Sequence, residues 1–147
     1  MMDKCIITII DTENIVVDSV TTLITYVEYR YKEYKNIGYF CFGMDDGKSS
    51  VSEQWKKAIF KGFYWISVKG EREKNKVDKA IIDKINELLN IPKFSAIDVW
   101  VIASSDGDYV PAIKAIKEKG HKAVVVGSAT TSAKLREACD EFYSIFN

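Results

Sequence analysis

The chain has 147 residues with 21 basic and 21 acidic side chains, so its formal net charge at pH 7 is zero. This length fits a single domain over residues 1–147 that buries its own core, and a zero net charge means that any nucleic acid would be held by a local basic patch. No apolar run is long enough to cross a membrane, and three scattered cysteines without a Cys-x-x-Cys pair indicate reduced thiols, which together predict a cytoplasmic protein.

The expected elements alternate between strand and helix along the whole chain. Residues 5–10 form a short, uninterrupted β-branched run that is typical of a buried strand, and residues 18–35 carry apolar side chains at helical spacing. We then expect, in chain order, a strand over 37–42, a helix over 51–61, a strand over 63–68, a polar loop over 69–77, a helix over 77–89, a strand over 97–103, a helix over 108–119, a strand over 122–127, a helix over 132–141 and a short terminal strand over 142–145. This alternation predicts a three-layer α/β/α domain with a mainly parallel five-stranded sheet, to which the terminal strand is a short addition.

Acidic, amide and hydroxyl side chains follow the expected strands, and a parallel sheet binds its ligands beyond the carboxyl ends of its strands. The residues concerned are Asp11 and Asn14 after the first strand, Asp78 at the start of the helix after the third, and Ser104, Ser105, Asp106 and Asp108 after the fourth. If the first and fourth strands are neighbours, two carboxylates about 5 Å apart repel each other by about 3 kcal/mol. Such a cluster favours a divalent cation, and hard oxygen ligands suit Mg²⁺ or Mn²⁺.

Each aspartate also has a structural explanation. Asp108 could cap the following helix, Asp78 could be favoured by the dipole of its helix, and Asp11 could belong to a turn. Capping accounts poorly for Asp106, because one acid suffices to cap one helix. His121 is the sole histidine and is expected at the surface, so carboxylates are the expected carriers of any chemistry, and a zinc site or a Ser-His-Asp triad has little support.

Basic residues gather around the polar loop that precedes the third acid. They are Lys69, Arg72, Lys74, Lys76 and Lys79. These side chains would steer phosphate groups towards the acidic edge of the sheet. The alternative is an ordinary solvated surface, because Glu71 and Glu73 dilute the positive charge. Tyr109 directly follows the second acid of its segment and is expected in the core rather than as a platform for base stacking.

Four blocks of the sequence together resemble the NYN domain of the PIN-like nuclease superfamily, including its bacterial LabA-like branch. The blocks are ITIIDTENI, KVDKAIIDKI, VWVIASSDGDYVPAIKAIKEKGHKAVVVG and SAKLREACDEFYSI. Their order and spacing agree with the family over essentially the whole chain. Two positions depart from the family pattern: Ser105 stands where a glycine is usual, and so does the pair Asn75-Lys76 before the central Val-Asp.

The resemblance implies a PIN-like, Rossmann-like sheet of order 3-2-1-4-5 and a metal-dependent endoribonuclease that hydrolyses RNA. On this interpretation Asp11 and Asp106 hold the principal Mg²⁺ or Mn²⁺ ion, and Asp108 and Asp78 hold a second ion or its waters. Asn14 and Ser104 or Ser105 orient a water molecule or the scissile phosphate. The partner is RNA, with single-stranded DNA as a further substrate to test, and a homo-oligomer or a regulatory protein partner is compatible with the sequence.

Three other interpretations stay open. The chain could be a catalytically inactive module of the same fold that binds RNA or regulates another protein. A Toprim-like phosphotransfer enzyme also has a pair of aspartates after a strand, but its first acid is a glutamate, and Asp78 would have no role in it. A nucleotide-binding Rossmann module is disfavoured because no Gly-x-Gly-x-x-Gly follows the first strand.

Overall fold

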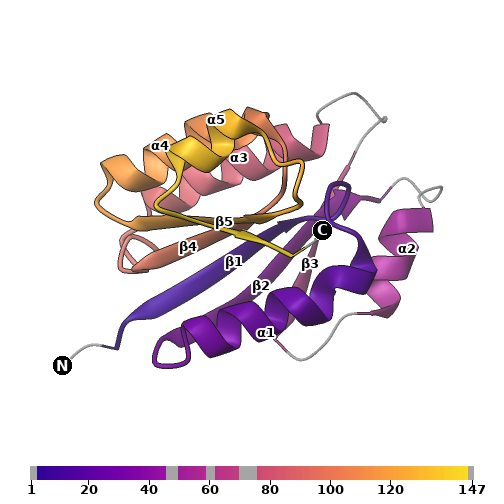
Figure 1. The fold of residues 1–147 in the computed structure, drawn as a ribbon, viewed down its shortest axis with the longest axis horizontal. Coiled ribbons are helices and arrows are strands. Elements are labelled where there is room, and N and C mark those ends of the chain that lie inside the picture. Colours follow the sequence, from indigo (N-terminus) through magenta and orange to yellow (C-terminus); the bar gives the residue numbers. More distant parts are fainter. Residues whose placement is uncertain (1–2, 46–49, 59–61, 70–75, 146–147) are drawn as a thin grey trace.

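Strands and helices alternate as the sequence predicts (Figure 1). The computed structural model describes residues 3–45, 50–58, 62–69 and 76–145. The elements are β1 (Cys5–Asp11), the 3₁₀ turn η1 (Val17–Ser19), α1 (Val20–Arg30), β2 (Lys35–Met44), α2 (Ser50–Lys57), β3 (Phe63–Val68), α3 (Lys76–Leu89), β4 (Val99–Ala103), the 3₁₀ turn η2 (Gly107–Tyr109), α4 (Val110–Glu118), β5 (Lys122–Gly127), α5 (Ala133–Ala138) and β6 (Glu141–Ser144).

The strands form one parallel sheet in the order β3-β2-β1-β4-β5-β6. This order confirms the predicted arrangement and the short C-terminal strand. Ile10 of β1 pairs with Ala103 of β4. That register puts Asp11, the last residue of β1, level with Ser104, the first residue after β4. The carboxyl ends of two neighbouring central strands therefore meet at one edge, which we call the carboxyl edge of the sheet.

Helices cover both faces of the sheet, with α1 and α2 on one face and α3, α4 and α5 on the other (Figure 1). Because successive side chains of a strand point to opposite faces, Ile10 packs in the core beneath α1 with Leu23, whereas Ile9 packs in the core beneath α3 with Ile81. Burying one such aliphatic side chain contributes about 1.5–3 kcal/mol relative to leaving it exposed. The two cores hold the central strands, and so the carboxyl edge, in a fixed position.

The first long helix is shorter than the predicted 18–35, and it ends at Arg30. Tyr31 leaves the helical conformation, with φ −119° and ψ 37°, while its N–H still donates to Val27 O. The chain must turn here because β2 begins at Lys35, where it pairs with the start of β1. The predicted helix was too long because it was based on the spacing of apolar residues, and the buried Tyr31 keeps that spacing after the helix has ended.

Two other helices also differ from the prediction. The last helix does not fill 132–141, because Cys139 is extended with φ −81° and ψ 163° and β6 begins two residues later. The predicted helix 108–119 is divided into η2 and α4. The last helix is short because the chain must enter β6 at Glu141. The regular helix α4 begins late because the 3₁₀ turn η2 comes first, next to the carboxyl edge.

No helix in the ranges that the structure describes is long and apolar enough to cross a membrane. Cys5, Cys41 and Cys139 are free thiols, as predicted. Helix α2 covers the first part of the predicted helix 51–61, whose residues 59–61 lie outside the described residues.

Candidate functional site

Three aspartates converge at the carboxyl edge. Asp78, Asp106 and Asp108 each offer a carboxylate oxygen, and these three atoms all lie within 4.8 Å of one another. Asp78 comes from the first turn of α3, and the other two come from the loop and 3₁₀ turn after β4. Two unit charges at this separation repel by about 3 kcal/mol at an effective dielectric constant near 20. The Asp cluster, by which we mean these three residues, is therefore strained when all its members are ionised.

Local hydrogen bonds orient the carboxylates of the cluster. Oδ1 of Asp106 accepts from the backbone N–H of Asp108 at 2.9 Å, so Asp106 caps η2. This corrects the expectation that a cap would explain Asp108 rather than Asp106. Oδ1 of Asp78 accepts from the backbone N–H of Lys79 at 2.8 Å. Asp106 and Asp78 each keep a second oxygen that can bind a ligand, so a structural role and a binding role are compatible in both.

The pKa of Asp78 is raised by its surroundings in the cluster. Its side chain is buried, and burial is the largest cause that raises its pKa. The hydrogen bond from the Lys79 amide opposes this rise, whereas the charges of Asp106 and Asp108 add to it. The carboxylate is thus destabilised by both desolvation and like charge, which are the conditions that a cation relieves.

Asp11 lies beside the cluster rather than within the group of three. Its side chain is 5% exposed. Its Oδ2 accepts from the hydroxyl of Tyr109 at 2.9 Å, and its Oδ1 accepts from the N–H of Glu13 at 3.1 Å. Burial raises the pKa of Asp11 to about 6 against the effect of these two hydrogen bonds, with a further rise from the charges of Glu13 and Asp78. Asp11 therefore shares the electrostatic field of the cluster.

Tyr109 contacts the candidate site, although sequence reasoning assigned it to the core alone. The ring is fully buried, as expected, but its hydroxyl donates to Asp11 across the interface between η2 and β1. A buried tyrosine hydroxyl usually finds a hydrogen-bond partner, and its place directly after Asp108 was the available signal. The sequence could not indicate which of the acids Tyr109 would contact.

Asn14 and the two serines tie the loops of the site together. Oδ1 of Asn14 accepts from the N–H of Ser105 at 2.8 Å and so links the segment after β1 to the segment after β4. The fully buried Ser104 accepts from the N–H of Asp106 through its Oγ at 3.1 Å. These contacts place both serines and Asn14 at the carboxyl edge, where they hold Asp106 in position.

Hydroxyl groups after β5 form a network that sequence reasoning did not include in the site. Ser105 Oγ lies 3.0 Å from Ser128 Oγ and 3.0 Å from Thr131 Oγ1, and it accepts from the N–H of Ser128 at 2.8 Å. Ser105 stands where the family usually has a glycine, and its hydroxyl is hydrogen-bonded to Ser128 and Thr131 in the loop after β5. A Cβ atom on Gly127 would lie 2.8 Å from Ser104 O, so this glycine keeps room for the network.

The predicted basic residues are only partly described. Lys69 and Lys79 are exposed and Lys76 is half-buried, on the two sides of the segment that leads into α3. Arg72 and Lys74 lie outside the described residues. Lys56, on the preceding helix, forms an ion pair with Asp45 at 2.9 Å, which neutralises its charge locally.

His121 is not the surface residue that the sequence predicted. Its ring is half-buried with a centroid 6.2 Å from that of Trp100, and its Nε2 is buried without a hydrogen-bond partner in the part of the chain that the structure describes. Burial lowers its pKa. It directly precedes β5 and so lies at the opposite end of the sheet from the Asp cluster.

Comparison with known proteins concerns the family and the fold. The sequence profile of the NYN domain matches residues 6–146. A crystal structure of a protein of unknown function from Vibrio parahaemolyticus superimposes with a TM-score of 0.71 over 97% of this chain and 93% of that chain, at 18% sequence identity. At this identity the likeness concerns the fold alone. None of the curated proteins matches the sequence significantly.

Proposed function

This chain belongs to the NYN domain family of the PIN-like nuclease superfamily, and from this premise we propose that it is a metal-dependent endoribonuclease. The family indicates a nuclease-like function. The cleavage of RNA, the divalent ion and the roles of individual residues are our proposal. One observation carries it: three carboxylates converge within 4.8 Å at the carboxyl edge, beside a fourth that is buried.

The donor set of the cluster suits a hard divalent cation. Carboxylate oxygens are the preferred ligands of Mg²⁺ and Mn²⁺. Burial raises the pKa of both Asp11 and Asp78, and neighbouring carboxylates add to the rise, so a bound cation would stabilise the ionised groups. When bound, such an ion supplies charge neutralisation to a phosphate and lowers the pKa of nearby water. We assign Asp78, Asp106 and Asp108 to the principal ion, with Asp11 as the neighbouring carboxylate. This differs from the pairing of Asp11 with Asp106 that the resemblance implies.

The chain's own residues then have distinct tasks. Tyr109 holds the Asp11 carboxylate through the hydrogen bond to its Oδ2. Asn14 fixes the segment that carries Asp106, because it accepts from the amide of Ser105. The amide nitrogen of the exposed Asn14 side chain has no hydrogen-bond partner in the described ranges, so it can donate to a phosphate oxygen or a water molecule.

We propose RNA as the substrate, with single-stranded DNA as the comparison that tests the choice. The exposed Lys69 and Lys79, with Lys76 between them, would attract phosphates towards Asp78. Arg72 and Lys74 belong to the same basic segment of the sequence and are included in this proposal on that ground. Because contacts between these basic side chains and phosphates release counterions, binding should weaken as the salt concentration rises.

The test is cleavage of end-labelled single-stranded RNA and DNA by purified protein with Mg²⁺, Mn²⁺ or a chelator. We expect RNA cleavage with a divalent ion, none with the chelator, and a loss of about 10³-fold or more in Asp106→Asn. Asp83→Asn is the matched control, because Asp83 is exposed on the outer side of α3. Full activity of Asp106→Asn would refute the proposal. RNA binding that is equal with and without chelator, without any cleavage, would favour a non-catalytic binding module instead.

A further inference from the structure

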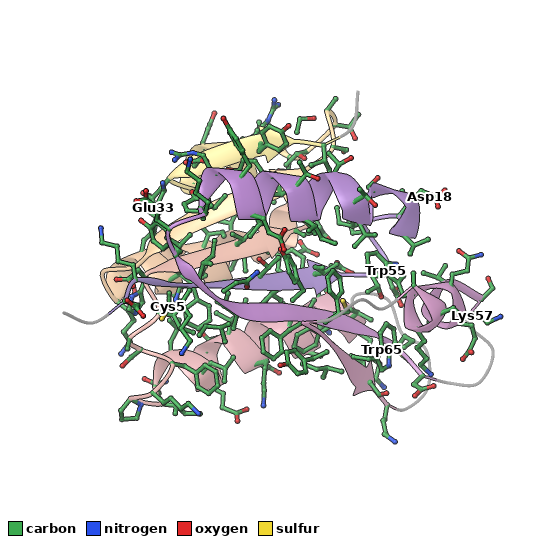
Figure 2. The ribbon with its side chains drawn as sticks, turned by 90° about the horizontal axis from the view of Figure 1, so that it is seen from below. Cys5, Asp18, Glu33, Trp55, Lys57 and Trp65 are labelled. Atoms are coloured by element: carbon green, nitrogen blue, oxygen red, sulfur yellow. The ribbon has the colours of Figure 1, made fainter. Side chains whose placement is uncertain are left out.

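A groove of about 610 Å³ opens beside the candidate site, on the other side of the carboxyl edge. One wall is the segment that follows β1 and includes η1, and the other is α2. Its lining begins at Thr12, the residue directly after Asp11. Figure 2 shows Trp55, a residue of α2, between Asp18 of η1 and Lys57 at the end of α2. We call this feature the α2 groove.

The two walls of the α2 groove present apolar side chains to solvent. Val16 on the first wall is 59% exposed and Val51 on α2 is 42% exposed, and both line the groove. Trp55 also belongs to the lining; this residue is 1% exposed, and its indole N–H has no hydrogen-bond partner among the described residues. Exposed aliphatic groups that flank a space of this size suit a flat, largely apolar ring, and the volume lies in the range of small-ligand sites.

The polar groups of the groove favour a neutral ring over a phosphate. Glu13 and Asp18 contribute carboxylates to the first wall, where an anion would be repelled. Gln54 on α2 adds an amide that can both donate and accept, as base recognition requires. Lys57 lies at the end of α2 and is exposed, so it can meet a phosphate outside the groove. This charge pattern would place a base inside and the sugar–phosphate backbone along the rim.

We propose that the α2 groove binds the base of an unpaired ribonucleotide next to the phosphate that the Asp cluster acts on. This inference rests on the proposed function and specifies its substrate class as single-stranded RNA. A base in a duplex is stacked and paired and cannot enter a side pocket without being extruded, whereas a base in a single strand can. Gln54 is then a specificity-determining residue, because it faces the hydrogen-bonding edge of the base.

The experiment measures binding in the Asp106→Asn background, so that RNA stays uncut. Fluorescence anisotropy with a short labelled single strand and with the same strand in a duplex gives the affinities. We expect the single strand to bind at least about ten-fold more tightly than the duplex, and Val51→Glu to weaken its binding by about ten-fold or more. Tyr29→Glu is the matched control, since Tyr29 is also an exposed apolar residue on a helix, 78% exposed on α1. Circular dichroism establishes that both variants are folded.

Gln54→Leu adds a second measurement that does not depend on charge. It keeps the size of the side chain and should reduce differences in affinity among single strands of different base composition, with little change in mean affinity. Equal effects of Val51→Glu and Tyr29→Glu, or equal affinity for single strand and duplex, would overturn the groove proposal even if the native protein cleaves RNA. Selective loss in Val51→Glu would support it even if no cleavage is found, in which case only the proposed function fails.

Discussion

The buried carboxylate of Asp11 allows a quantitative prediction about the protein without bound metal. Burial raises the pKa of Asp11 from its ordinary value of 3.8 to about 6. The folded chain therefore binds this proton more tightly than the unfolded chain, so ionisation of Asp11 opposes folding. The cost grows as the pH rises from 3.8 to about 6 and is constant above that range. Since one pKa unit corresponds to about 1.4 kcal/mol, the full cost at neutral pH is about 3 kcal/mol.

Asp11→Asn removes this titration and nearly preserves the shape of the side chain. The asparagine lacks one acceptor oxygen, so it loses a hydrogen bond from Tyr109 or from the Glu13 amide, at a cost of about 1 kcal/mol that does not depend on pH. Near pH 7.5 the variant should therefore be about 2 kcal/mol more stable than the native protein. Near pH 4 only a small part of the ionisation penalty is present, so the two stabilities should be similar.

The assay is urea unfolding followed by circular dichroism, in the presence of a chelator, at several values between about pH 4 and pH 7.5. The measured quantity is the free energy of unfolding of Asp11→Asn minus that of the native protein. Asp83→Asn serves as the control because this exposed carboxylate should give a difference near zero throughout. A difference for Asp11→Asn that stays constant or decreases as the pH rises would refute the ionisation cost assigned to Asp11.

Three further outcomes follow from contacts in the site. Tyr109→Phe removes the hydroxyl that donates to Asp11 and lowers its pKa, so the acidic limb of the pH–rate profile should move to higher pH. The free energy of unfolding should fall by about 1–3 kcal/mol. An unchanged pH–rate profile would contradict the role assigned to this hydroxyl. Mn²⁺ should raise the melting temperature of the native protein and not that of Asp106→Asn, and equal shifts would place the ion elsewhere. Gly127→Ala should cost about 1–3 kcal/mol and slow cleavage, because its Cβ would lie 2.8 Å from Ser104 O; a variant of native stability would show that the hydroxyl network can move.

Much of the fold could be predicted because its signals are local. β-Branched runs without interruption, such as residues 5–10, mark strands that are buried on both faces. The neighbouring positions of β1 and β4 were implied by the resemblance to the family, and the pairing of Ile10 with Ala103 agrees with it. The ends of helices were less predictable. Tyr31 keeps the apolar spacing of α1 although its backbone has already turned towards β2, and only the pairing of β2 with β1 determines where that turn occurs.

Some features of the candidate site could also be predicted from the sequence, and others could not. Aspartates at strand ends could be identified because the carboxyl edge of a parallel sheet has a fixed relation to the sequence. The cap that Asp106 provides could not be assigned, because Asp106 and Asp108, two residues apart, both fit the pattern of a cap before the helix. The contact between Asn14 and the Ser105 amide and the hydroxyls of Ser128 and Thr131 were also not foreseen. They depend on side-chain directions in loops that are far apart in the sequence.

The rate of single-stranded RNA cleavage with Mn²⁺, compared between the native protein and Asp106→Asn, tests the central claim most directly. The account predicts that the native protein cleaves, that chelation stops cleavage, and that Asp106→Asn is slower by about 10³-fold or more while it unfolds at the native temperature or above. Equal rates for the native protein and Asp106→Asn would contradict the account, and so would cleavage that continues in excess chelator.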